Sequence, residues 1–314
     1  MTKARILADY VAGGTTATEF DYLDGLTSAA VGINDTQTLT NKTLTSPTFT
    51  GTTTGHTASR NENIYATTNI SNAANATTVK ITADKLTVWN TSNQFHILSS
   101  VDVSPAITAS GANGLDTGSE ANSTWYYYYV IYNGSTVAGL FSASYSSPTM
   151  PSGYTYKKYI GAIYNQSGGD LVELYQKGNW CFTFYGTGDQ DQNIKQMYSS
   201  SCTANTEHTV NPTAFIPPNA DYYRFRNQAS TSSPQSYINV HFHAFDYLRQ
   251  SAHRHGVNDS QDYIYIKDHS GQSVQAGGEH EMPMIVAQTF YINPNYTPGS
   301  LDLYHLGYKF NGVE

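Results

Sequence analysis

Apolar residues recur at a regular interval in a polar stretch near the start of the chain. Between residues 38 and 52 the unit Thr-apolar-Thr-x-x occurs three times, with Leu39, Leu44 and Phe49 at its apolar positions. A period of five matches neither the turn of a helix, about 3.6 residues, nor the two-residue alternation of a strand. The flanking threonines are β-branched and favour an extended backbone.

Five extended residues advance about 16 Å, so the segment offers one apolar side chain over that length. A single chain cannot bury side chains that are so sparse, whereas several parallel copies can pack them around a common axis. The segment therefore predicts a shaft of several chains, with Leu39, Leu44 and Phe49 on its axis. The alternative is a disordered Thr-rich linker in which the three units occur by chance.

A short helix is predicted before this segment. Thr16 and Glu19 have the spacing of a capping box, and Phe20, Leu23 and Leu26 follow at three-residue intervals. A helix of two turns with three apolar residues is not stable alone in water, so we expect it to dock on another surface.

Strand-like patterns dominate the chain after residue 75. Its strongest feature is a hairpin in which residues 125–132 and 136–141 flank Asn133-Gly134. This pair favours a type I′ turn, because both residues tolerate a positive φ. Tyrosines fill positions 126–129 and place rings on both faces of the strand, so both faces must be covered and we expect these rings to pack internally. Strand-like residues are also predicted upstream, beginning at 78–82, continuing through 86–89 and reaching 95–98.

A second hairpin is predicted from residues 159–164 to 171–175 through the Gly-rich turn at 166–169. From about residue 180 onward, short strand-like runs are separated by Pro-containing breaks, a pattern typical of a β-sandwich or jelly roll. The last run, 301–308, alternates and is expected to close that sheet. The predicted fold is therefore mostly β, with an extended fibre-like N-terminal part. We divide the chain into residues 1–34, a Thr-rich shaft or linker at 35–75, a β module at 76–178 and a β-sandwich-like domain at 179–314.

Composition and charge narrow the classes of partner. Charged residues form 13% of the chain, about half the usual share, while 26 tyrosines and 25 glycines enrich it in strand and turn formers. The net charge of -8 disfavours direct binding to nucleic acid or to an anionic membrane surface. No apolar run approaches the roughly 18 residues of a membrane span, and the first residues lack the apolar core of a secretory signal. Cys181 and Cys202 are expected to be buried thiols, with a single disulfide as the alternative.

Several of these segments resemble a known family. They look like parts shared by many bacteriophage tail-fibre and virion-appendage proteins, and they lie at residues 23–25, 35–47, 49–51, 114–126 and 151–156. The resemblance covers roughly residues 20–165. It implies an intertwined homotrimer that is assembled in the host cytoplasm and exposed on the virion surface. It also implies that residues 1–34 attach to another virion structural protein, while the C-terminal β domain points outward.

Two His-x-His pairs are candidate metal ligands. In a strand, His241 and His243 point to the same face. If that face lay on the axis of a trimer, three chains would supply six imidazole nitrogens, a set that suits Fe(II), Ni(II) or Zn(II). Metal sites of this kind occur in some phage fibres and spikes. The alternative is an exposed strand with solvated histidines, and the second pair, His253 and His255, fits a simple turn.

Clusters of tyrosine and arginine are candidate sugar contacts. Aromatic rings stack on the apolar faces of sugars, and arginine donates hydrogen bonds to hydroxyl groups. The candidates for binding a host receptor or glycan are Tyr222, Tyr223, Arg224, Arg226, Tyr263 and Tyr265. The alternative is that these residues belong to strand cores or to packing between chains.

The sequence contains no nucleophile elbow, no phosphate-binding glycine loop and no zinc-protease spacing. We therefore expect a structural virion protein, not an enzyme: a tail fibre that attaches to a host-surface receptor, either a glycan or a protein. One alternative is a head fibre or tail adaptor without receptor contact. Another is a tail-spike enzyme that degrades polysaccharide, because scattered carboxylates can form a glycosidase pair in space.

Overall fold

The computed structural model describes residues 63–68, 76–184, 196–200, 202–231, 238–244, 262–266, 274–294, 298 and 300–310. All of them belong to one compact unit, residues 52–314. The short helix predicted at 16–26 and the axis residues Leu39, Leu44 and Phe49 lie outside the described residues. The described part is mostly β and contains no helix, which confirms the predicted fold class at that level.

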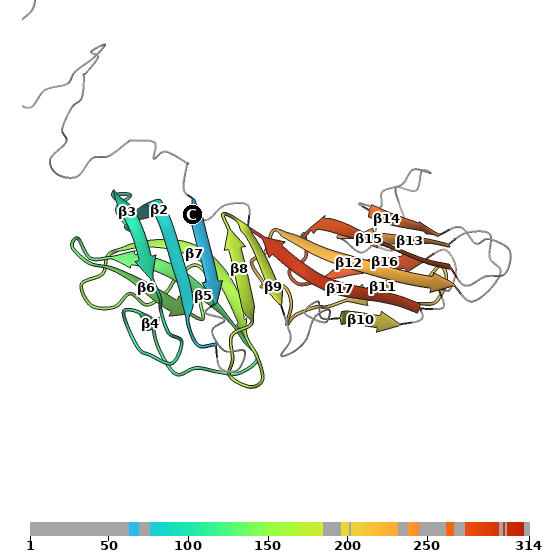
Figure 1. Cartoon of the computed structure of the whole chain (residues 1–314), viewed down its shortest axis with the longest axis horizontal. Coiled ribbons are helices and arrows are strands. Elements are labelled where there is room, and N and C mark those ends of the chain that lie inside the picture. The colour runs from blue at the N-terminus through green and yellow to red at the C-terminus, as the bar shows by residue number, and fades with distance from the viewer. Residues whose placement is uncertain are drawn as a thin grey trace, which may run out of the picture. The chain divides into compact units, whose positions relative to one another are not determined.

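The larger of two sheets runs in the order β15-β12-β17-β9-β8-β1-β2-β7-β5-β6-β4, with β3 beside β2 and β10 beside β17 (Figure 1). Its strands are β1 (Ile64–Thr68), β2 (Val79–Trp89), β3 (Phe95–Val103), β4 (Gly114–Leu115), β5 (Thr124–Tyr132), β6 (Val137–Ser142), β7 (Tyr156–Asn165), β8 (Glu173–Lys177), β9 (Trp180–Phe184), β10 (Gln196–Ser200), β12 (Tyr222–Thr231), β15 (Val274–Pro283) and β17 (Ser300–Lys309).

The smaller sheet has four antiparallel strands in the order β11-β16-β13-β14. They are β11 (His208–Val210), β13 (Ile238–His243), β14 (Asp262–Ile266) and β16 (Phe290–Pro294). This sheet packs face to face on β12: the ring of Phe225 lies 5.1 Å from that of Phe242 on β13 and 5.3 Å from that of Phe290 on β16. The described residues between 208 and 309 thus contribute to two packed β layers.

The tyrosine-rich strand β5 lies inside the protein. Every residue from Trp125 to Ile131 is at most 9% exposed, and β5 pairs with β6 on one side and β7 on the other. Two of the hydroxyls reach buried or half-buried acceptors, since Tyr128 bonds to the side chain of Gln176 and Tyr129 donates to the carbonyl of Ser144 at 2.6 Å. The prediction that this run is internal packing is confirmed.

The two predicted hairpin turns differ in outcome. Strands β5 and β6 do form a hairpin, but its loop has four residues, and only Gly134 in it has a positive φ, 99°. The carbonyl oxygen of the Asn133 side chain instead accepts hydrogen bonds from the amides of Ser135 and Thr136, at 2.9 and 2.7 Å. The type I′ turn was therefore the wrong prediction. An Asx turn, in which a side chain replaces a backbone acceptor, stabilises this loop.

The second predicted hairpin closes only at its turn. Val172 donates its amide to the carbonyl of Tyr164 at 3.0 Å, but β8 then leaves β7 and pairs with β1 and β9. The last predicted strand is present as β17, and it lies between β12 and β9, not at an edge.

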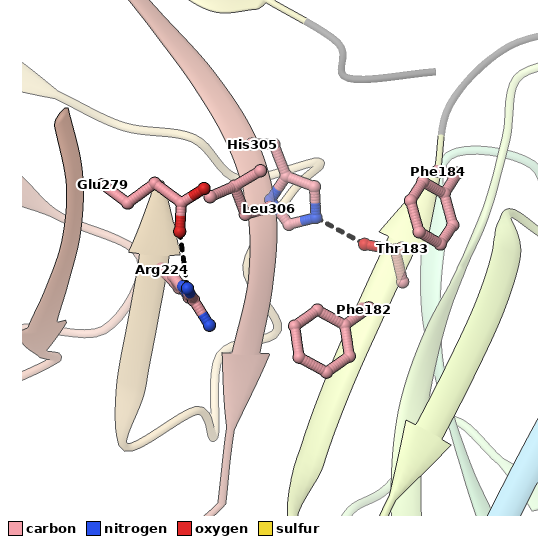
Figure 2. A pocket seen from close by; sticks show the side chains of 7 residues that line it. All are labelled: Phe182, Thr183, Phe184, Arg224, Glu279, His305 and Leu306. Atoms are coloured by element: carbon pink, nitrogen blue, oxygen red, sulfur yellow. Dashed lines mark hydrogen bonds and ion pairs between the residues drawn. The ribbon is translucent and has the colours of Figure 1, made fainter. Parts of the chain in front are cut away.

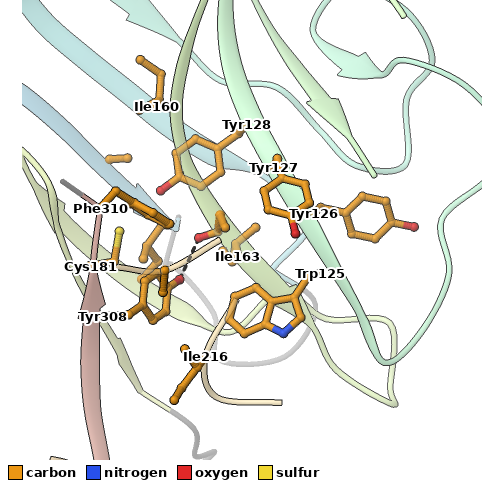
Figure 3. Close-up of a cluster of buried hydrophobic side chains, with 14 of the residues drawn as sticks. Trp125, Tyr126, Tyr127, Tyr128, Ile160, Ile163, Cys181, Ile216, Tyr308 and Phe310 are labelled. Carbon is orange, nitrogen blue, oxygen red and sulfur yellow. Dashed lines mark hydrogen bonds between the residues drawn. The ribbon is translucent and has the colours of Figure 1, made fainter. Parts of the chain in front are cut away.

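A single buried core continues across residues 178 and 179, the position of our predicted domain boundary. These two residues form the turn between the paired strands β8 and β9. Two contacts join residues before this turn to residues after it. Trp125 donates its indole N–H to the carbonyl of Thr213 at 2.7 Å, and the rings of Tyr159 and Phe310 lie 5.5 Å apart. Figure 3 shows how Tyr308 and Phe310, from the end of the chain, lie beside Cys181 and face the side chains of β5.

Candidate functional site

The outer face of the large sheet carries a concentration of aromatic side chains. Along β9, Cys181 and Thr183 are buried while Trp180, Phe182 and Phe184 are half-buried on the opposite face. The rings of Trp180 and Phe182 lie nearly parallel, with centroids 6.0 Å apart. On the neighbouring strand β8, the ring of Tyr175 is 47% exposed. Because side chains alternate along a strand, the aromatic rings of β8 and β9 gather on the outer face of the sheet.

Cross-strand register adds cations to this surface. The residues opposite one another on β12, β17, β9, β8 and β1 are Tyr222, Lys309, Trp180, Lys177 and Tyr65. We call these five residues the aromatic–lysine row, because rings and ammonium groups alternate along it.

The ammonium groups of the row lie over the ring faces. Nζ of Lys309 is 5.1 Å from the ring centroid of Tyr222 and 5.3 Å from that of Trp180, and Nζ of Lys177 is 6.0 Å from that of Tyr65. These distances are within the range of cation–π attraction. Among the described residues, neither lysine lies within ion-pair distance of a carboxylate.

A small cavity of about 170 Å³ lies next to the row. Figure 2 shows Arg224 and Glu279 on one side of it and Phe182 and Phe184 on the other. Gly307 lies between Arg224 and Phe182 in the register of the three strands. The Arg224 guanidinium is 2.5 Å from the Glu279 carboxylate, so its charge is already balanced within the chain.

The His305 imidazole lines this cavity, and both of its ring nitrogens have hydrogen-bond partners within the protein. One ring nitrogen of His305 bonds to the Thr183 hydroxyl, and the other lies 3.0 Å from the Tyr223 hydroxyl. Burial lowers the pKa of His305 to about 3, so the ring is neutral at physiological pH. Two satisfied nitrogens and a neutral ring fit a packing role better than acid–base chemistry.

The two cysteines are buried free thiols, as the composition led us to expect. Burial raises the pKa of the Cys181 thiol far above its ordinary value, and it also raises the pKa of Cys202. Both groups are therefore held in the protonated, unreactive form.

The predicted sugar-binding residues divide by strand alternation. Tyr222, Arg224 and Arg226 lie on the outer face of β12, but Tyr223 points inward and has no exposed surface. Its ring stacks 5.7 Å from that of Phe225, so we remove Tyr223 from the set that a sugar can contact. The backbones of Tyr263 and Tyr265 belong to β14, and their side chains lie outside the described residues.

The predicted metal ligands also lie in a strand. His241 and His243 both belong to β13, where the side chain of His243 is 4% exposed and that of His241 lies outside the described residues. Within the described part of the chain, no group of three or more His, Cys, Asp or Glu side chains is placed to hold a metal ion. The axial metal site requires ligands from three copies, and it stays a prediction.

The row itself was missed by sequence reasoning, apart from Tyr222. Lys177 and Trp180 flank Gly178-Asn179, a local hairpin signal that the sequence reasoning did not use. Tyr65 lies in the segment that we assigned to the linker, and Lys309 is far from the other members in the sequence. The alternation Trp-Cys-Phe-Thr-Phe at 180–184 is another local signal, since it predicts an aromatic face.

Comparison with known proteins does not extend this description. No family model matches the chain, and no curated protein is significantly similar to it. Among the described residues, no helix is long and apolar enough to cross a membrane.

Proposed function

We propose that the chain is a structural virion protein of the bacteriophage tail-fibre type, which attaches to a saccharide on the host surface. The observation that carries the proposal is the open sheet face with its aromatic rings and cations. Ring faces bury the apolar faces of sugars, and nearby polar groups bond to their hydroxyls. A flat face of this kind suits a long surface polymer better than a small metabolite.

The buried titratable groups support binding as the role of this face. Cys181, Cys202 and His305 are held neutral by burial, and the Arg224 guanidinium is neutralised by Glu279. In the described residues around the cavity, Glu279 is the only carboxylate that lines it, so no pair of acids is brought together there. Glycoside hydrolysis usually needs two carboxyl groups flanking the scissile bond.

Assembly into a trimer would multiply weak contacts. The repeat with Leu39, Leu44 and Phe49 calls for several parallel chains, and the resemblance to virion appendages implies three. Three weak sites on one particle appendage raise avidity by orders of magnitude without a tight individual site. Residues 1–34 would join another virion protein.

Two measurements on the full chain test this proposal. Light scattering should give a mass of about three times the 34.4 kDa of one chain. The purified protein should compete with phage adsorption to host cells and leave no halo when spotted on a host lawn. A halo would indicate a polysaccharide-degrading enzyme. Absence of cell binding, with immunogold labelling of the head or tail, would indicate a head fibre or adaptor.

A further inference from the structure

We infer that the aromatic–lysine row binds an acidic saccharide in which uncharged and carboxylate-bearing sugars alternate. This inference rests on the proposed function and specifies its ligand. It concerns the five residues Tyr222, Lys309, Trp180, Lys177 and Tyr65, of which only Tyr222 was a candidate from the sequence.

The spacing of the row supports a repeating ligand. Neighbouring strands lie about 4.8 Å apart, so successive rings on β12, β9 and β1 are about 10 Å apart, with one ammonium between each pair. One sugar residue in an extended chain has a length similar to one strand spacing. A saccharide that crosses the strands would therefore place alternate sugars over rings and the intervening sugars beside ammonium groups.

The charge of the row favours an acidic ligand. Each ammonium has three donors and a full positive charge, and a ring face satisfies them only in part. Within the described residues, Lys177 and Lys309 have no carboxylate within 4.0 Å, whereas the nearby Arg224 is paired with Glu279. The carboxylates of a ligand would thus pair with Lys177 and Lys309, and not with Arg224, whose charge Glu279 already balances.

The aromatic surface provides the remaining contact area. Trp180 and Phe182 form a nearly parallel pair on one strand, and Tyr175 lies opposite Phe182 on β8. These rings widen the row at its middle, so a sugar over Trp180 can bury its apolar face while the adjacent sugars reach Lys309 and Lys177.

Isothermal titration of the full-length protein with two oligosaccharides of equal length tests the inference. The first is a hyaluronan oligosaccharide, in which N-acetylglucosamine and glucuronate alternate. The second is an uncharged chito-oligosaccharide. We expect tighter binding of the hyaluronan oligosaccharide, and a difference that shrinks as salt is added.

Four variants locate the site. Lys177→Gln and Lys309→Gln should each weaken hyaluronan binding about fivefold and leave the chito-oligosaccharide unaffected. Trp180→Ala should weaken the binding of both oligosaccharides. Lys85→Gln removes an exposed lysine of β2 outside the row, is the matched control for charge, and should change neither affinity. Circular dichroism of each variant verifies that it folds.

Each other outcome overturns the inference in a distinct way. Equal affinity for both oligosaccharides removes the acidic class but leaves the proposed attachment function. Binding of neither, by a protein that still binds host cells, places the receptor contact elsewhere. Failure to bind cells as well removes both proposals. If Trp180→Ala reduces the mass measured by light scattering, the row is an interface between copies and not a saccharide site.

Discussion

The hydroxyl of Tyr308 donates a hydrogen bond of 2.7 Å to the backbone carbonyl of Ala162, 146 residues earlier in the chain. Tyr308 is on β17 and Ala162 on β7, strands that are not neighbours in the large sheet. Both residues are fully buried, so water cannot replace this bond. The contact joins β17 to β7, the strand that pairs with the tyrosine-rich β5, and makes the two parts depend on each other for stability.

Removing the Tyr308 hydroxyl should lower the stability of the folded protein. We expect Tyr308→Phe to lower the free energy of unfolding by about 1–3 kcal/mol, because it leaves a buried carbonyl without that partner. Urea denaturation measures the change. Tyr175→Phe, at a ring that is 47% exposed, is the control and should cost less than about 0.5 kcal/mol. Equal effects of the two changes would contradict the assigned role of the hydroxyl.

Gly307 is required by the close approach of β17 to β9. A Cβ atom at this position would overlap the carbonyl oxygen of Cys181, which belongs to the backbone and cannot swing away. We expect Gly307→Ala to destabilise the protein by about 1–3 kcal/mol, since one of the two strands must shift. In thermal denaturation, the control Gly168→Ala should have a much smaller effect, because the nearest atom to its Cβ is 3.7 Å away. A neutral Gly307→Ala would show that the strands can separate at no cost.

The buried His305 should make stability depend on pH. Its folded-state pKa is about 3, against an ordinary value of 6.5 in the unfolded chain. Between these values the unfolded chain binds a proton at this site and the folded protein does not. The free energy of unfolding should therefore fall as the pH falls below 6.5, by about 1.4 kcal/mol per pH unit from this group.

Urea denaturation at several pH values between about 4.5 and 7.5 measures that slope. The variant His305→Gln should lose this contribution, although it also starts from a lower stability. His96→Gln removes an exposed histidine and should keep the wild-type slope. An unchanged slope in His305→Gln would mean that His305 is not the group responsible.

Cys181 should be chemically silent in the folded protein. Its side chain is fully buried and burial raises the pKa of its thiol, so very little thiolate is available. In a Cys202→Ser background, we expect no reaction with a thiol reagent such as Ellman's reagent at mildly alkaline pH until urea unfolds the chain. Rapid modification without unfolding would show that the core around Cys181 opens.

Local sequence patterns were sufficient to predict several strands of the described region. Alternation and β-branched or aromatic enrichment are properties of a few adjacent residues, and they placed β2, β3, β5, β6 and β17 correctly. The turn at Asn133 was mispredicted because Asn-Gly favours a two-residue turn. The protein forms a four-residue loop instead, in which the Asn133 side chain accepts two backbone hydrogen bonds. Strand β8 was assigned the wrong partner, since a turn determines where a strand begins but not what it pairs with.

The candidate site was predictable only in part. The tyrosines and arginines of the cluster Tyr222–Arg226 predicted sugar contacts. Strand alternation places one of them, Tyr223, on the buried side of β12. Of the remaining members, Lys177 and Trp180 flank the turn between β8 and β9, whereas Tyr65 and Lys309 come from strands that are remote in sequence. Their alignment depends on registers such as Tyr222 opposite Lys309 and Lys309 opposite Trp180.

Composition and short-range patterning alone determined that the described part of the chain forms mostly strands and that the tyrosine run is covered on both faces. These outcomes depend on the polarity and shape of neighbouring residues, which the sequence displays directly. Only the tertiary structure decided which strands are adjacent, and so which rings and ammonium groups share one face. Pairing between distant strands is selected by the packing of the whole core, and shifting one strand by a single residue would turn its side chains to the opposite face.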